Sequence, residues 1–489
     1  MEHERIILGI IILGTLMGAI DTTIVLLALP DITQALGANL SATIWTILIY
    51  LLVLTVVTTQ FGRLGDLFGR SRMFNFGFLI FTVGSALCGL STSAGMLVGF
   101  RAVQAVGGAF LAATSGAIIA DTFEVGRRGR AYGYTGMGWN MGAMLGIVLG
   151  GVLTTFLGWQ YIFYINVPIG IVALFLGVKY LRDNPKVEAK LDIAGMLLFA
   201  VALSALSYGS VDFASMGASS FNVFLVILGA VLLLVFLALE KRSSSPMLDL
   251  RAFANRVLSA SVFASFFQAL GFLSVAFVII LYLQGIRGLD PFTASLVLVP
   301  GYVISSFTSP FMGRLSDRFG SRVIATTGIA FLIAAVLVYL TINATTSLYV
   351  IVFASVLSGL GGSMFWPANN SAVMSSAEPG HYGSISGLLR FMSSIGTLGS
   401  FVIAITAATL AVPRQVAFGV FVGTSKLIGG LSADFLTGIH SAFIVALAIL
   451  MVAGILSAAR GKEQRQPQTG QPARWHQASP ADQGHAATS

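Results

Sequence analysis

Long apolar runs constrain this chain more than any other feature of its sequence. A membrane core about 30 Å thick needs roughly 20 apolar residues per helix. Charged residues make up only 9% of the chain, whereas soluble proteins carry about 25%. A soluble enzyme is therefore excluded, and we expect an all-α polytopic membrane protein with 14 transmembrane helices. The expected spans are 6–30, 42–61, 73–92, 96–119, 132–155, 160–180, 193–211, 221–239, 257–283, 293–312, 323–342, 348–369, 384–410 and 438–458.

The basic residues indicate how these helices are oriented. If the N-terminus lies inside, 22 of the 27 Lys and Arg residues fall in inner segments, 3 in outer segments and 2 within helices. Such an excess on one side is what the positive-inside rule predicts. We therefore expect a multi-pass protein of the plasma (inner) membrane with both termini in the cytoplasm. The net charge of +8 then reflects orientation, so no nucleic-acid partner is expected.

A glycine-aspartate-basic segment occurs twice, at 62–72 and at 313–322, with an offset of 251 positions. Both copies fall on the inner side, and parallel repeats of six helices mark one class of secondary transporter. We expect an N-terminal six-helix bundle (1–182), two inserted helices (183–250), a C-terminal six-helix bundle (251–460) and a disordered cytoplasmic tail (461–489). The gating residues of the repeated segment are Gly62, Asp66, Gly69, Arg70, Gly313, Asp317 and Gly320.

These features resemble the major facilitator superfamily, and more narrowly its fourteen-helix drug:proton antiporters of the EmrB/QacA type. The resemblance covers roughly residues 6–460. Besides the repeated segment, it is carried by residues 21–30 in the first helix, by the run 159–170 and by the end of the ninth helix at 282–288. It implies two bundles that rock around a central site.

Asp21 and Arg101 are the charged residues on which the functional reading depends. Asp21 lies near the middle of the first helix, and an acid at that depth is costly unless it faces a cavity or a partner. Burial favours its neutral form, so we expect it to exchange a proton. Arg101 resembles the arginine of the superfamily's fourth-helix motif, which is implicated in proton relay. A static structural ion pair is the alternative for both residues.

The fifth helix carries glycines at intervals of four residues. Such a stripe lets another helix approach closely. It resembles the antiporter motif of this helix, although Ile147 stands where that motif usually has proline. Simple helix packing is a sufficient alternative. The stripe consists of Gly138, Gly142, Gly146 and Gly150, followed by Gly151.

The aspartates of the repeated segment are expected to act as a conformational latch. Each carboxylate can pair with an arginine or cap the N-terminus of a neighbouring helix. A second membrane-embedded cation, Arg390, is expected either to pair with Glu378 or to reach inner water.

Polar and aromatic side chains scattered among the helices are candidates for the wall of a substrate cavity. Aromatic rings can stack on planar or cationic molecules, although they are also ordinary lipid-facing residues. The candidates are Tyr50, Gln104, Asn140, Gln160, Gln268, Tyr282, Trp366 and Asn369.

The sequence favours a proton-coupled secondary transporter, acting as a monomer, that exports lipophilic, cationic or neutral drug-like compounds. It contains no nucleotide-binding or metalloprotease motif and only one cysteine, so no cofactor or metal is expected and the proton gradient supplies the energy. The partners are then the lipid bilayer, a small-molecule substrate and protons. One alternative is a dedicated exporter of a single endogenous lipid, siderophore or metabolite. A more distant alternative is a non-transporting membrane sensor.

Overall fold

The computed structural model describes residues 2–38, 40–183, 192–217, 219–243, 252–378, 381–411, 413 and 431–461. Within these residues every regular element is helical, and thirteen helical segments are long and apolar enough to cross a membrane. A further helix of 30 residues, α14 (Tyr382–Ala411), brings the long helices to the expected fourteen. The predicted all-α polytopic fold is therefore confirmed.

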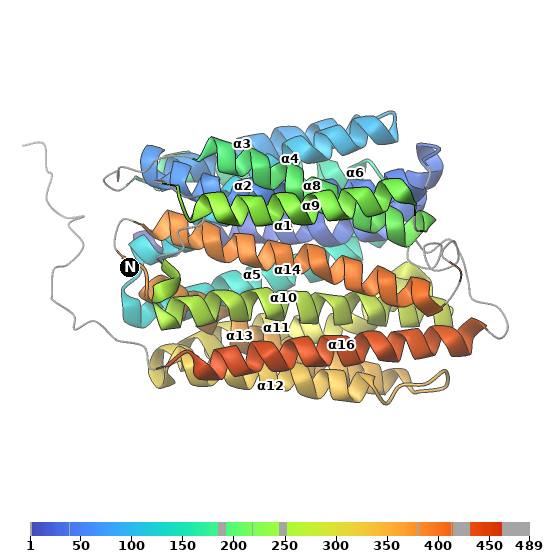
Figure 1. Cartoon of the computed structure of the whole chain (residues 1–489). Coiled ribbons are helices and arrows are strands. Elements are labelled where there is room, and N and C mark those ends of the chain that lie inside the picture. The colour runs from blue at the N-terminus through green and yellow to red at the C-terminus, as the bar shows by residue number, and fades with distance from the viewer. Residues whose placement is uncertain are drawn as a thin grey trace, which may run out of the picture.

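The N-terminal helices form one side of the bundle (Figure 1). The predicted span 6–30 is too short, because the helix continues through polar residues at both ends. The span 160–180 is interrupted after Tyr164 and forms a short and a longer helix. The elements are α1 (Glu2–Ala35), α2 (Leu40–Phe68), α3 (Arg70–Gly89), α4 (Ala94–Thr122), α5 (Arg128–Phe156), α6 (Tyr161–Tyr164) and α7 (Asn166–Tyr180).

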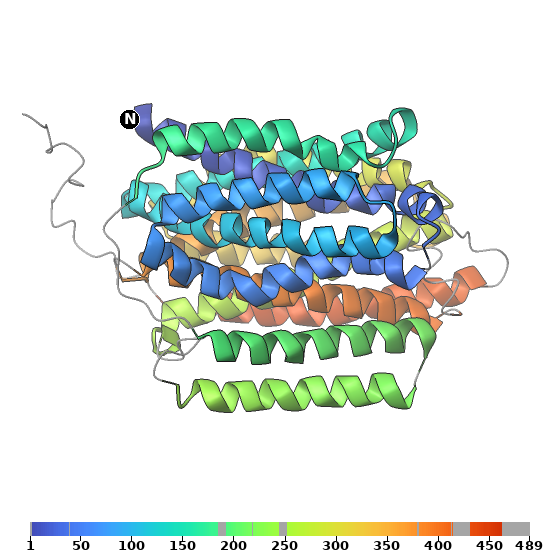
Figure 2. The same cartoon turned by 90° about the horizontal axis from the view of Figure 1, so that it is seen from above.

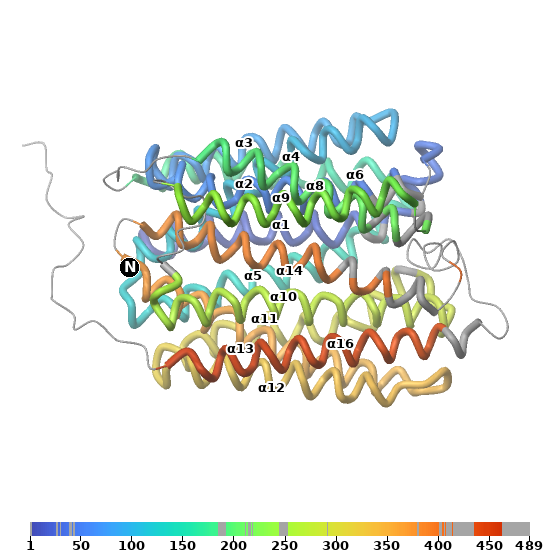
Figure 3. Tube along the Cα trace, in the orientation of Figure 1, coloured from blue at the N-terminus to red at the C-terminus, as the bar shows by residue number. Residues whose placement is uncertain are grey.

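The C-terminal helices form the opposite side of the bundle, as the colours of Figure 3 show. The first of them, α10 (Arg256–Leu281), continues into a single π-helical stretch at Tyr282–Ile286. Two prolines lie within the next helix, at positions 300 and 310. The remaining elements are α11 (Pro291–Phe319), α12 (Ser321–Tyr339), α13 (Leu348–Ser375), α14 and α16 (Leu431–Ala459).

Helices α8 (Ile193–Met216) and α9 (Ser220–Glu240) pack against each other at one edge of the bundle (Figure 2). Helix α8 contacts α2 of the N-terminal side and α14 of the C-terminal side. Trp45 of α2 stacks on Tyr208 with ring centroids 5.6 Å apart. Phe199 of α8 lies 5.1 Å from the ring of Phe391 in α14. Helix α8 therefore attaches the α8–α9 pair to both the N-terminal and the C-terminal side of the bundle.

The two sides meet along two seams, α2 with α14 and α5 with α11. Helices α2, α4 and α11 end at one end of the bundle, and α3, α5, α12 and α14 begin there. We call this the basic end, because Arg70, Arg128 and Arg314 lie there. Nearly all of the predicted tail 461–489 lies outside the described residues.

Candidate functional site

Asp21 and Arg101 form an ion pair within the N-terminal helices. The guanidinium Nη1 of Arg101 lies 2.6 Å from Asp21 Oδ2 and donates to Gln104 Oε1 at 2.7 Å. Gln104 Nε2 donates to Asp21 Oδ1 at 2.8 Å, and Asn166 Nδ2 donates to the same oxygen at 3.5 Å. The sequence pointed to the first three of these residues; Asn166 joins them because α7 begins beside α1. Both carboxylate oxygens are thus bound by donors from α4 and α7.

The Asp21 network is closed on all sides in this conformation. Asp21 and Gln104 are 0% exposed and Arg101 is 1% exposed. The Arg101 guanidinium carbon lies 4.4 Å from the ring centroid of Tyr50, and its Nε donates to the carbonyl of Thr46 at 3.1 Å. Water does not reach Asp21 here, so any exchange of its proton requires a different arrangement of these helices.

The glycine stripe of α5 lies against α1. A methyl group at Gly142 would approach the carbonyl oxygen of Leu16 to 2.5 Å, and one at Gly138 would approach Ile12 to 2.9 Å. Gly146 likewise faces Thr23, whose hydroxyl donates to the carbonyl of Ala143 at 3.2 Å. The stripe therefore joins two helices of the same side. Of the two glycines at its end, Gly150 is buried, and Gly151 faces Phe292 of α11 across the seam.

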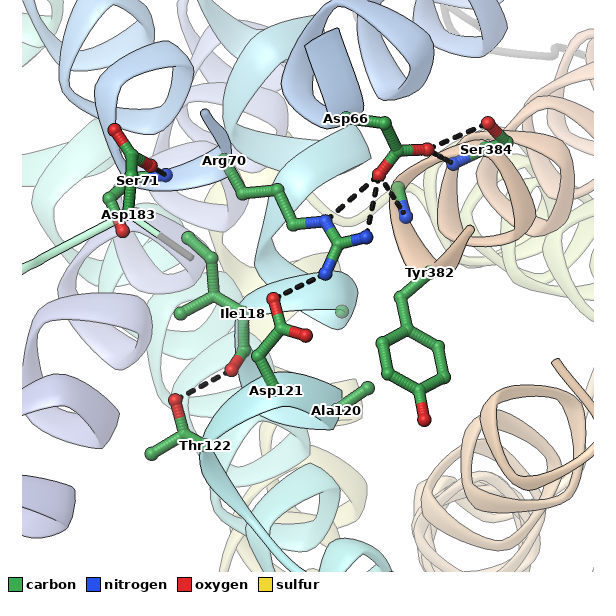
Figure 4. Close-up of polar contacts among 12 residues, drawn as sticks. Asp66, Arg70, Ser71, Ile118, Ala120, Asp121, Thr122, Asp183, Tyr382 and Ser384 are labelled. Atoms are coloured by element: carbon green, nitrogen blue, oxygen red, sulfur yellow. Dashed lines mark hydrogen bonds and ion pairs between the residues drawn. The ribbon is translucent and has the colours of Figure 1, made fainter. Parts of the chain in front are cut away.

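Asp66 links the N-terminal and C-terminal sides at the basic end (Figure 4). Its carboxylate accepts from the backbone N–H groups of Gly383 at 3.0 Å and Ser384 at 2.9 Å, in the first turn of α14. It also accepts from Arg70 Nη2 at 2.7 Å, and the other end of that guanidinium pairs with Asp121. Gly62, one turn earlier, faces the Gly383 backbone so closely that a side chain there would clash. Asp121 escaped the sequence reasoning because nothing near it in the sequence resembles a motif.

Asp317 makes the corresponding contact in the second copy. Its carboxylate accepts from the backbone N–H of Gly129 at 2.8 Å and of Arg130 at 2.9 Å, in the first turn of α5. Gly313 packs against the Gly129 backbone, as Gly62 does against Gly383. The copies differ at the position of Arg70, whose counterpart is Ser321; the buried hydroxyl of Ser321 has no hydrogen-bond partner among the described residues. Gly69 and Gly320 precede α3 and α12 with φ values of 107° and 95°.

A third contact at the basic end was missed by sequence reasoning. Arg128 donates to the carbonyls of Phe123 and Ala120 on its own side and to the carbonyl of Met374 on the other side, at 3.1, 2.6 and 3.1 Å. Its Nη2 also donates to the hydroxyl of Tyr382 at 3.1 Å. The Arg70 guanidinium lies 5.5 Å from the same phenol ring. Contacts between residues about 250 positions apart leave no local signal in a sequence.

The candidate cavity residues do not gather into one site. Tyr50 and Gln104 belong to the Asp21 network. Asn369 of α13 is 0% exposed and donates to the carbonyl of Ser261, while Gln268 of α10 is buried with no hydrogen-bond partner among the described residues. The others are dispersed: the Tyr282 hydroxyl donates to the carbonyl of Asn343, Asn140 donates to the carbonyl of Gly136 in its own helix, Trp366 packs edge-on against Phe365, and Gln160 precedes α6.

Arg390 does not pair with Glu378 as one sequence expectation had it. Glu378 is exposed beyond the end of α13, whereas Arg390 lies within α14 and forms no ion pair with any residue that the structure describes. The described part of the chain also contains no cluster of His, Cys, Asp and Glu able to hold a metal ion.

Comparisons with known proteins agree with this architecture. The chain is 32% identical over 404 residues to the riboflavin transporter RibZ of Clostridioides difficile. The aligned region covers 81% of this chain and 87% of that protein. It is 30% identical over 480 residues to the multidrug resistance protein Stp of Mycobacterium tuberculosis, covering 90% and 89% of the two chains. It is also 30% identical to the tetracenomycin C resistance and export protein of Streptomyces glaucescens, covering 81% and 74%.

Solved transporter structures share the fold. The human organic anion transporter MFSD10 superposes with a TM-score of 0.60 at 15% identity, covering 91% of this chain and 99% of that one. The proton:xylose symporter XylE gives the same score at 12% identity. The family model for the Major Facilitator Superfamily matches residues 11–401. The chain therefore belongs to the major facilitator superfamily and is a membrane transporter, not an enzyme.

Proposed function

We propose that this chain is a proton-coupled exporter of lipophilic small molecules, acting as a monomer by alternating access, with Asp21 as its main protonation site. The observation that carries the proposal is the fully buried Asp21–Arg101 pair, because an ion pair is expensive to bury and embedded acids in transporters mark proton pathways. The multidrug resistance and export relatives support the direction of transport. The basic end is then cytoplasmic, as the distribution of Lys and Arg predicts.

Protonation of Asp21 would act through its partners. A neutral carboxyl no longer forms an ion pair with the Arg101 guanidinium, so the contact between α1 and α4 loses its charge attraction, and the hydrogen bond from Asn166 of α7 weakens. Because Asp21 is sealed in this conformation, the proton must enter and leave in other states of the cycle. Differential affinity of those states for proton and substrate supplies the coupling.

The test measures efflux of a fluorescent dye from proteoliposomes with an imposed pH gradient. Asp21→Asn should lower the rate of gradient-driven efflux at least about tenfold, because the variant cannot bind and release the coupling proton and about 1.4 kcal/mol of barrier corresponds to tenfold in rate. The matched control is Asp31→Asn, which removes an exposed acid from the same helix and should leave efflux unchanged. Because breaking one partner of a buried pair costs about 3–5 kcal/mol, Asp21→Glu is included as a variant that keeps the charge. Equal gradient-driven efflux by wild type and a folded Asp21→Asn protein would remove Asp21 from the mechanism.

The 32% identity to a riboflavin transporter favours a second candidate, transport of a single endogenous compound. A competition screen against dye efflux separates the two functions. Several unrelated weak competitors support multidrug export, whereas one tight competitor supports a dedicated transporter. For multidrug export, the sequence predicts a cationic or neutral substrate.

A further inference from the structure

Arg390 is a membrane-embedded cation that the proposed proton pathway does not use. It lies eight residues after the start of α14, about 12 Å along the helix at 1.5 Å per residue. Its side chain is partly exposed, yet it makes no hydrogen bond or ion pair with any residue in the described part of the chain. A guanidinium is always charged, and in a membrane it is stable only when paired or hydrated.

The surroundings of α14 place Arg390 in the interior of the protein. No described residue from Tyr382 to Ser400 is exposed, because α2, α4, α8, α10 and α16 pack around this helix. The partial exposure of Arg390 is therefore not exposure to the lipid. Its charge is held inside the bundle, where water-sized molecules still reach it.

Two neighbours show which way the side chain faces. Ser386, one turn before Arg390, lies against Gly116 of α4, so that a methyl group at Gly116 would come within 2.7 Å of the serine hydroxyl. The Tyr132 hydroxyl of α5 donates to the carbonyl of the same Gly116 at 2.8 Å, so α4 and α5 meet opposite this face of α14. Arg390 thus points from the C-terminal side toward α4 and α5 of the N-terminal side, on the membrane side of the contacts made by Tyr382.

The nearby acids of α2 and α4 are already engaged. Asp66 is bound by Arg70 and by the first turn of α14, and Asp121 is bound by the other end of the Arg70 guanidinium. Asp21 pairs with Arg101 in a closed network. A cation inside the bundle that no carboxylate of the described residues neutralises has a strong preference for an anion delivered from elsewhere.

We propose that Arg390, at the seam between the two sides of the bundle, anchors a carboxylate group of an otherwise lipophilic substrate. Guanidinium binds carboxylate through two parallel hydrogen bonds, which gives both strength and orientation. The inference rests on the proposed export function and narrows its substrate class. It differs from the cationic or neutral substrate that the sequence predicts, because Arg390 is a cation without a partner among the described residues, whereas Asp21 is paired with Arg101.

Equilibrium binding of three probes that share one hydrophobic body tests this. The probes are 1-pyrenebutyrate, 1-pyrenebutanol and 4-(1-pyrenyl)butyltrimethylammonium, titrated against the full chain in nanodiscs with empty nanodiscs subtracted. Wild type should bind the carboxylate about tenfold more tightly than the alcohol and more tightly still than the ammonium, as one charge-assisted pair predicts. Arg390→Gln should abolish the preference for the carboxylate, and Arg390→Lys should keep part of it.

The matched control is Arg322→Gln, which removes an exposed arginine at the start of α12 and should leave all three affinities unchanged. A thermal melt verifies that each variant is folded, and affinity of Arg390→Gln for the alcohol reports separately on the apolar part of the site. Wild type without a preference for the carboxylate would overturn the proposal, as would a preference that survives in Arg390→Gln. No gradient is present, so failure of proton coupling leaves this result unaffected.

Discussion

Asp66 and Asp317 lie 251 positions apart, and each carboxylate caps the first turn of a helix on the opposite side of the molecule: α14 for Asp66 and α5 for Asp317. Each carboxylate accepts two backbone N–H groups, from Gly383 and Ser384 for Asp66 and from Gly129 and Arg130 for Asp317. Both contacts cross a seam at the basic end. Carboxylates at helix N-termini satisfy otherwise unpaired N–H groups and interact favourably with the helix dipole. The repeat therefore stabilises the closed form of this end twice over.

The two carboxylate contacts should differ in strength, because Asp66 is also held by Arg70 and, through it, by Asp121, whereas Ser321 stands at the position of Arg70 in the second copy. We predict that Asp66→Asn opens the basic end more than Asp317→Asn does. The measurement is the distance between spin labels at positions 72 and 322, both exposed at that end. The single cysteine, the buried Cys88, is first replaced by alanine to provide the background. Equal openings in the two variants would contradict the prediction.

Tyr382 should contribute through its ring more than through its hydroxyl. Its ring lies 4.9 Å from the guanidinium carbon of Arg128 and 5.5 Å from that of Arg70, whereas the hydroxyl makes one hydrogen bond. Tyr382→Phe should therefore lower the free energy of unfolding by about 1 kcal/mol. Tyr382→Ala should cost more, because two cation–π contacts worth about 0.5–2 kcal/mol each are also lost. Thermal unfolding in detergent ranks the variants, and equal midpoints would refute the role of the ring.

The contact between α1 and α5 should tolerate no added volume at the glycine stripe. Gly142→Ala places a methyl group 2.5 Å from the Leu16 carbonyl oxygen and 2.8 Å from the Ala19 methyl, so the helices must separate. Overpacking of this kind costs about 1–3 kcal/mol. The control is Gly18→Ala on the facing helix α1, where a methyl group meets nothing within 4 Å. We expect Gly142→Ala to lower the melting temperature and Gly18→Ala to leave it unchanged. The reverse order would show that the stripe is not closely packed.

Phe199 should be the side chain that most firmly attaches α8. It is 2% exposed and packs against Phe236 of α9 and Phe391 of α14. Phe199→Ala should lower stability by about 3–5 kcal/mol, as for other buried aromatics. Phe224→Ala on α9, where the ring is 56% exposed, should have little effect on the melting temperature. A small effect of both would mean that the helix pair is held elsewhere.

Hydrophobic length and charge placement were enough to predict the helices, because a membrane leaves a chain few other ways to satisfy its backbone. The Asp21–Arg101 pair was also predictable, since each charge is buried in an apolar run and needs a partner. What sequence reasoning missed depends on which face of a helix meets which neighbour. Asp121, Arg128 and Tyr382 look like ordinary loop-edge residues until folding brings α4, α5 and α14 together. The cavity candidates failed to converge for the same reason: Gln268 and Tyr50 are both polar but lie on opposite sides of the bundle.

The two seams of the bundle are not equally open to the bilayer. Helix α8 covers the approach to α2 and α14, whereas α5 and α11 carry exposed apolar side chains such as Val148 and Phe307 along their outer faces. From within the lipid tails, the α5–α11 seam is therefore accessible, whereas α8 shields the α2–α14 seam. Under the proposed export of lipophilic compounds, substrate from the membrane would reach the protein on the flank opposite α8 and α9.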